Sequence, residues 1–237
     1  MRLAFLSHPG SVRTNNEDAV HCDPEIGLFI VADGIGGNEG GEIASATAVQ
    51  TVVEKFASPS TVSTRELLRE AFYEANHILR DVGKERNMKG MGTTLTAAKI
   101  EGDTIHLVHV GDSRAYLLNE NSILQLTTDH TLSNQLYIEG SITREEAAVH
   151  PQRHVLTRSI GQETLVEVEE KTIEWEKGCY LFLCSDGMHN LVPDNEIQEV
   201  IIKALDLELG LRHLLQTAIE HGGYDNISAI IIAHDKS

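Results

Sequence analysis

The sequence predicts an α+β fold, with a central antiparallel β-sandwich of two sheets flanked by helix pairs in a four-layer αββα order. Strand-like apolar runs occur in blocks and do not alternate one by one with helices, so a doubly wound parallel sheet is not expected. Amphipathic segments come in two pairs. The chain has 237 residues, 41% of them hydrophobic, and no linker or repeat divides it. We therefore expect residues 1–237 to form a single domain.

Eight segments are expected to be strands, because apolar residues run through them continuously or alternate with polar ones. They lie near residues 2–7, 26–32, 93–99, 104–110, 114–119, 166–174, 179–184 and 227–233. Two antiparallel sheets packed face to face would bury the apolar sides of all these segments.

Four segments have the apolar spacing of amphipathic helices. In residues 40–56, Ala44, Ala48 and Val52 follow one another at intervals of four. The other helices are expected near residues 64–82, 194–204 and 207–221. One pair precedes the main block of strands and the other follows it, so each pair is expected to cover the outer face of one sheet.

The stretch 127–160 differs from the rest of the chain. It is short, polar, rich in histidine and poor in long apolar runs. We expect it to leave the core as a flap, and surface segments of this kind often carry specificity.

Composition limits the partners and the location. A formal net charge of −17 argues against binding to nucleic acid or anionic membranes, which require a basic surface. No segment approaches the roughly 20 apolar residues of a membrane span, and the first apolar run is too short for a signal peptide. A cytoplasmic protein is expected. Cys22, Cys179 and Cys184 lack CxxC spacing and are expected to be reduced thiols.

Four carboxylates lie at the ends of apolar strand segments, each beside or near Gly or Asn: Asp33, Asp112, Asp186 and Asp225. A single residue of this kind more often belongs to a turn. Four that converge would repel one another unless cations compensated them. We infer a site for divalent cations, and the hard oxygen ligands favour Mg²⁺ or Mn²⁺ over zinc.

Twelve histidines raise the alternative of a zinc site. No HExxH motif occurs, and His106 and His109 are three residues apart in an expected strand, so they point to opposite faces. His130 and His154 could contact substrate, but structural or surface roles are favoured. For Arg114, pairing with an acid is favoured over binding phosphate.

Six sequence blocks resemble the metal-dependent protein serine/threonine phosphatases of the PPM or type 2C family, especially its compact bacterial members. The blocks are RTNNED at 13–18, VADGIGG at 31–37, GMGTT at 90–94, HVGDSR at 109–114, SDG at 185–187 and DN at 225–226. The resemblance spans nearly the whole chain, and six ordered blocks make it specific.

The resemblance implies the four-layer sandwich and the hydrolysis of phosphoserine and phosphothreonine in proteins by a metal-activated water. Two core Mn²⁺ or Mg²⁺ ions would be bound. Their ligands would be Asp33 bridging both, Asp186 and Asp225 at the first ion, and the Gly34 carbonyl with Glu17 or Asp18 at the second.

The resemblance also implies a third, weaker ion at Asp112, and a phosphate-binding role for Arg13. Arginine suits this role because its planar fork donates two hydrogen bonds and keeps its charge. Arg13 and Asp33 would be the catalytic residues. The alternative for Arg13 is an ion pair with Glu17 or Asp18.

The expected partners are phosphoproteins, together with a cognate serine/threonine kinase that the enzyme opposes, and a monomer is expected. Two other functions stay open: a catalytically silent binding module on the same fold, and a metallohydrolase of small phosphate esters. Survival of the metal carboxylates argues against the first. One departure from the family is Asn38, where many members have a His, because Asn cannot act as a general acid at neutral pH.

Overall fold

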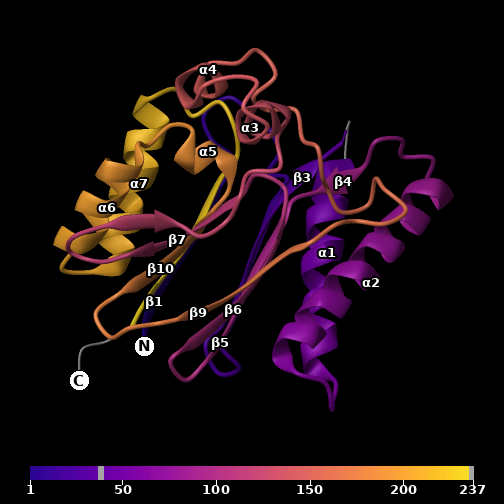
Figure 1. Ribbon diagram of the computed structural model, residues 1–237, viewed down its shortest axis with the longest axis horizontal. Helices are drawn as coiled ribbons and strands as arrows, with labels where there is room; N and C mark the ends of the chain where they lie inside the picture. Colours follow the sequence, from indigo (N-terminus) through magenta and orange to yellow (C-terminus); the bar gives the residue numbers. More distant parts are fainter. Residues whose placement is uncertain (37–39, 235–237) are drawn as a thin grey trace.

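The computed structural model describes residues 1–36 and 40–234, which form two antiparallel β-sheets packed face to face (Figure 1). The strand order of the first sheet is β1 (Arg2–His8), β11 (Ile227–Ala233), β10 (Tyr180–Cys184), β7 (Arg114–Leu118) and β8 (Ile123–Gln125). The order of the second is β2 (Asp18–Asp23), β3 (Leu28–Ile35), β5 (Leu95–Glu101), β6 (Thr104–Val110) and β9 (Glu169–Glu174), with the short β4 (Gly92–Thr93) beside β3. The predicted sandwich is confirmed.

Helices cover both outer faces of the sandwich, as predicted (Figure 1). The second sheet is covered by α1 (Gly40–Ala57) and α2 (Thr64–Glu85), and the first by α6 (Asp194–Lys203) and α7 (Leu207–Glu220), with the short α5 (Asp186–His189) nearby. No helix among the described residues has both the length and the apolar composition needed to cross a lipid bilayer.

The apolar core has three layers, one at each interface between the four layers of helices and sheets. Between the sheets, Phe29 and Val31 of β3 pack in one cluster with Leu183 of β10 and Ile230 of β11, and all four are fully buried. Separate clusters lie between each sheet and its helices. Full burial of one such side chain contributes about 1.5–3 kcal/mol. Because β3, β10 and β11 are buried on both faces, each of them contributes side chains to two of these layers.

The strand β2 was not predicted. All six of its residues are only partly buried, and it begins and ends with Asp, so its apolar signal is weak. It forms because its backbone pairs with β3 over the full length of the strand. The three-residue β8 was missed because it is too short for a periodic signal.

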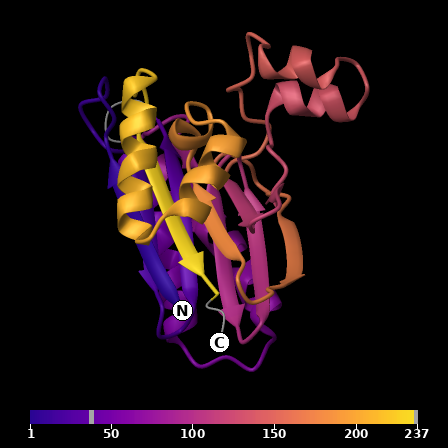
Figure 2. The ribbon, with the colours of Figure 1, turned by 90° about the vertical axis from the view of Figure 1, so that its left-hand side faces the viewer.

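The predicted excursion is a flap that stands away from the sandwich and carries α3 (Leu132–Ile138) and α4 (Arg144–Ala148) (Figure 2). Helices this short are not stable alone, and both begin with a cap. The Thr131 hydroxyl accepts a hydrogen bond from a backbone N–H of α3, and Thr143 with Glu146 forms a capping box on α4.

Candidate active site

The sheet topology brings the four strand-end carboxylates to one end of the sandwich. β3 and β6 both run antiparallel to β5, so they end at the same edge, which places Asp33 near Asp112. In the other sheet, β10 ends where the antiparallel β11 begins, so Asp186 and Asp225 meet there.

A cavity of about 860 Å³ opens at this end. Seven of the eight residues predicted for the site line it: Arg13, Glu17, Asp33, Gly34, Asp112, Asp186 and Asp225. The eighth, Asp18, is not among the lining residues. It pairs with Asp33 across the strand ladder, and its Oδ2 accepts a hydrogen bond of 2.7 Å from Ser185, which belongs to the other sheet.

Glycine permits the close backbone approach on one side of the cavity. A side chain at Gly34 would collide with the Gly41 carbonyl, and one at Gly41 would meet the carboxyl group of Glu17. The peptide of Asp33 is held by Thr94, whose hydroxyl accepts from the Asp33 N–H at 2.8 Å and whose N–H donates to the Asp33 carbonyl at 2.9 Å. The first turn of α1 thus lies directly against the end of β3.

Four buried aspartates of the site have raised pKa values. Burial, followed by repulsion from neighbouring carboxylates, raises the pKa of Asp33 and of Asp112 well above its usual range. Burial is also the main cause that raises the pKa of Asp18 to about 7 and that of Asp186 to about 6. The chain supplies too little positive charge here to balance these groups.

Two oxygens of this cluster are buried without a partner. Within the described part of the chain, the Oδ1 atoms of Asp18 and Asp186 have no hydrogen-bond donor. An unsatisfied buried acceptor is costly. A divalent cation of the hard, oxygen-binding kind would compensate such atoms, so the residues present fit Mg²⁺ or Mn²⁺.

Arg13 is half exposed on the wall of the cavity and donates to Asp225 Oδ2 at 3.0 Å. This hydrogen bond raises the pKa of the guanidinium. The ion pair is with Asp225, so the alternative weighed from the sequence, in which Arg13 pairs with Glu17 or Asp18, is wrong. Asp225 is more than 200 residues away in the chain, and no local pattern could have identified it.

The flap contributes residues that sequence reasoning did not assign to the site. Arg153 and His154 both line the cavity, and His154 Nδ1 lies 4.0 Å from Asp186 Oδ2. Burial, followed by the charge of Arg153, lowers the pKa of His154. Asn38, the departure from the family pattern, lies outside the described residues.

Arg114 has the structural role expected for it. It forms a two-pronged ion pair with Asp129, with Nε–Oδ1 and Nη2–Oδ2 distances of 2.9 Å and 2.6 Å. Burial opposes ionisation of Asp129, yet the Arg114 hydrogen bonds and charge lower its pKa below the usual value.

Outside the cavity, two histidines and a glutamate are close enough to bind a metal ion, but the hydrogen bonds of one histidine argue against it. In the described part of the chain, His109, His130 and Glu169 bring ligand atoms within 4.8 Å of one another. His109 has no free nitrogen, because Nε2 faces the carbonyls of Gly111 and Thr128 at 3.0 and 3.2 Å, while Nδ1 bonds a threonine hydroxyl. The carboxylates of the cavity are not gathered so tightly, and a pair of ions would spread its ligands over a wider set of oxygens.

A two-sheet sandwich whose end holds a cavity of unbalanced carboxylates, with Arg13 and Arg153 on its wall, defines the class of metal-dependent phosphohydrolases. The family is shown by comparison with known proteins. The family model described as "Protein phosphatase 2C" matches residues 10–216, and the chain belongs to this family.

Relatives agree in sequence and in structure. The chain is 34% identical to the serine/threonine phosphatase stp of Listeria monocytogenes, over 99% of this chain and 96% of that protein. The serine/threonine phosphatase PstP/Ppp of Mycobacterium tuberculosis superposes with a TM-score of 0.92 at 34% identity, over 99% of each chain. The catalytic domain of the serine/threonine phosphatase PstP in complex with 2 manganese ions gives 0.87 at 33% identity, over 97% of this chain and 96% of that one.

The family resemblance read from the sequence is thereby confirmed. The protein is a metal-dependent serine/threonine phosphatase that acts on phosphoproteins. The comparisons give no support to a silent binding module or to an enzyme of small esters.

Proposed function

We propose that the cavity binds two Mn²⁺ or Mg²⁺ ions, with Asp33 as the bridging ligand. The observation that carries this proposal is the combination of raised carboxylate pKa values and unpartnered buried oxygens in one place. The manganese found with the related PstP catalytic domain supports it.

The remaining ligands are proposed from the residues that line the cavity together with Asp33. Asp186, just after β10, and Asp225, just before β11, would hold one ion. The Gly34 carbonyl with Glu17 would hold the other, because Gly34 and Glu17 line the cavity beside Asp33. Asp18 is hydrogen-bonded to Ser185 and does not line the cavity. It would act on the metal ion indirectly, either through Asp33 or through a water.

When bound, paired divalent ions activate a water and neutralise the charge that builds up on the phosphoryl oxygens. Arg13 would bind the phosphate, since its guanidinium stands at the cavity wall and is half exposed. On substrate binding, Arg13 would donate hydrogen bonds to the phosphate and weaken its hydrogen bond to Asp225. Thr94 keeps the backbone of Asp33 oriented through hydrogen bonds to the Asp33 N–H and to the Asp33 carbonyl.

Asp112 would bind a third, weaker ion together with Asp186. Its carboxylate lines the same cavity, and the Asp186 charge is the largest neighbouring contribution to its raised pKa. The biological partner would be a serine/threonine kinase whose phosphoproteins this enzyme dephosphorylates. A single catalytic domain, a monomeric state and a cytoplasmic location stay predictions.

The test is metal replacement with defined substrates. Phosphoserine and phosphothreonine peptides are incubated with chelated protein, which is then supplied with Mn²⁺, Mg²⁺ or Zn²⁺. Activity should vanish in chelator and return better with Mn²⁺ or Mg²⁺ than with Zn²⁺, because the ligands are hard oxygens. Full activity in excess chelator would overturn the proposal. A small aryl phosphate, assayed in parallel, compares catalysis on peptides with catalysis on a minimal ester.

A further inference from the structure

The flap is joined to the sandwich by two chain segments that pair with each other. The Thr157 N–H donates to the His130 carbonyl at 2.8 Å, and the Leu132 N–H donates to the Val155 carbonyl at 2.9 Å. These bonds make residues 130–132 and 155–157 a two-stranded root for the flap.

His130 fastens this root to a single residue directly after β6, Gly111. The Gly111 N–H donates to His130 Nδ1 at 3.0 Å, and the Gly111 carbonyl accepts from the His130 N–H at 2.8 Å. Gly111 has a φ of +111°, and a side chain there would collide with Thr94. The next residue is Asp112, whose carboxylate faces the cavity. His130 thus joins the root of the flap to Gly111, the residue that precedes Asp112.

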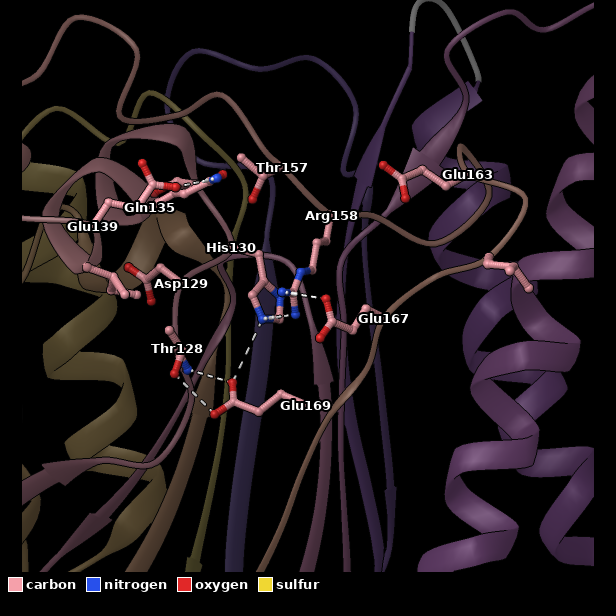
Figure 3. A pocket seen from close by; sticks show the side chains of 13 residues that line it. Thr128, Asp129, His130, Gln135, Glu139, Thr157, Arg158, Glu163, Glu167 and Glu169 are labelled. Atoms are coloured by element: carbon pink, nitrogen blue, oxygen red, sulfur yellow. Dashed lines mark hydrogen bonds and ion pairs between the residues drawn. The ribbon is translucent and has the colours of Figure 1, made fainter. Parts of the chain in front are cut away.

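The hydrogen bonds also assign the tautomer of His130. Since Nδ1 accepts a backbone N–H, the proton of the neutral ring is on Nε2. Arg158 Nη1 lies 3.4 Å from Nε2, so that contact brings two donors together and does not hold the ring (Figure 3). Glu169 Oε2 is 3.9 Å away, which is too long for a hydrogen bond.

The ring is therefore kept in place by Gly111 and by its neighbour His109. The two imidazoles stack with centroids 5.0 Å apart, and the His130 side chain is 7% exposed. Burial, followed by the charges of His109 and Arg158, lowers the pKa of His130 to about 3, so the ring stays neutral at physiological pH. A neutral ring preserves the acceptor that Gly111 requires.

We propose that His130 is a positioning residue that locks the root of the flap to Gly111, the residue before Asp112, so that the flap and the Asp112 carboxylate are oriented together. The consequence for turnover rests on the proposed role of Asp112. The lock itself is a property of the metal-free chain and can be measured without catalysis.

Two substitutions separate the hydrogen bond from the volume of the ring. His130→Phe keeps the stack on His109 but removes the acceptor, leaving the Gly111 N–H buried and unpaired. His130→Asn loses ring volume but restores an acceptor close to the position of Nδ1. The matched controls are His150→Phe and His150→Asn, because His150 Nδ1 accepts the Gln152 N–H at 3.1 Å within the flap. Among the described residues, no hydrogen bond joins His150 to the root.

The first measurement is amide hydrogen exchange of the metal-free proteins across residues 132–157, with circular dichroism to establish that each variant is folded. His130→Phe should speed exchange of the flap roughly tenfold, the usual effect of losing one buried hydrogen bond. His130→Asn should restore most of the protection, and the His150 variants should match wild type at the root.

The second measurement is the Mn²⁺ concentration that gives half-maximal turnover of a phosphoserine peptide. It should rise at least about threefold in His130→Phe and recover in His130→Asn. Wild-type exchange in His130→Phe would overturn the lock. So would equal damage in both His130 variants, because it would show that ring volume and not the acceptor matters. A protein without phosphatase activity would leave the exchange result unaffected, so failure of the proposed function is distinguishable.

Discussion

Asp112 and Asp129 are separated by 17 positions in the chain, and their carboxyl groups have pKa values shifted in opposite directions. Both carboxyl groups are largely buried, yet the pKa of Asp112 is raised well above its usual value, while that of Asp129 is lowered. Asp129 has Arg114 bound to both of its oxygens. Asp112 faces Asp186 and a cavity lined by further carboxylates.

The difference shows how to tell structural from metal-binding acids in a chain of net charge −17. Where the chain supplies its own cation, burial is compensated and the ion pair stabilises the fold. At the cavity, the chain does not compensate the burial and mutual repulsion of the carboxylates. Binding of a cation from solution would remove this cost and is therefore strongly favoured. The five predictions below test this contrast.

The largest effect is expected from Asp33→Asn. The change removes the charge that would bridge two ions, and kcat should fall at least ~10³-fold while the fold is kept. Steady-state kinetics at saturating Mn²⁺ measure it, with Asp81→Asn on the exposed face of α2 as the control. A rate within tenfold of wild type would exclude Asp33 as the bridging ligand.

Arg114→Met tests whether Arg114 stabilises the fold by compensating the buried Asp129. It leaves the Asp129 carboxylate largely buried without its cation, so the free energy of unfolding should fall by about 3–5 kcal/mol. Urea denaturation measures this. In the control, Arg212→Met breaks an exposed pair with Glu208 and should cost less than about 0.5 kcal/mol. Equal losses in the two variants would contradict the structural role of Arg114.

For Arg13→Ala, KM should rise with a smaller fall in kcat. The expected cost is about 1.5–3 kcal/mol, the value of a charge-assisted hydrogen bond present in both ground and transition states. Arg13→Lys should recover part of it. If Arg13 serves only to orient Asp225, excess Mn²⁺ should rescue the variant, and KM measured at saturating Mn²⁺ distinguishes the two roles.

Asp112→Ala should leave two ions bound while turnover falls at least about tenfold, because only the third site is removed. Calorimetric titration with Mn²⁺ counts the ions, and kinetics at limiting and saturating Mn²⁺ gives the turnover. Unchanged turnover at both concentrations would remove this residue from the mechanism.

The smallest effect concerns the stability of the metal-free protein. The folded pKa of Asp33 lies above its unfolded value, so its stabilising contribution is present at low pH and is lost as pH rises through the folded pKa. Asp33→Asn should therefore stabilise the metal-free protein at pH 8, and by less at pH 5.

Urea midpoints of wild type and Asp33→Asn at the two pH values give this difference. The comparison is needed because the buried His130 and His189 have pKa values lowered to about 3, and their effect on stability has the opposite sign below pH 6.5. Added Mn²⁺ should reverse the ranking at pH 8. A destabilised metal-free variant at pH 8 would show that Asp33 is not under charge strain.

Much of the fold could be predicted because its signals are local. The apolar runs of β3 and β10 and the four-residue spacing in α1 identify elements from neighbouring residues alone. The edge strand β2 carries almost no such signal and is a strand because β3 lies beside it. The flap could be predicted only as an excursion, since its short helices depend on their caps and on the root.

The sequence by itself determined the family, the four-layer sandwich and the carboxylates at strand ends, because each of these rests on residue type and short spacing. Only the tertiary structure decided the partners: Asp225 for Arg13, Asp129 for Arg114 and Gly111 for His130. Such pairs join segments that are distant in the chain, and the packing of the sheets and the flap, not any local periodicity, determines which atoms come within hydrogen-bond distance.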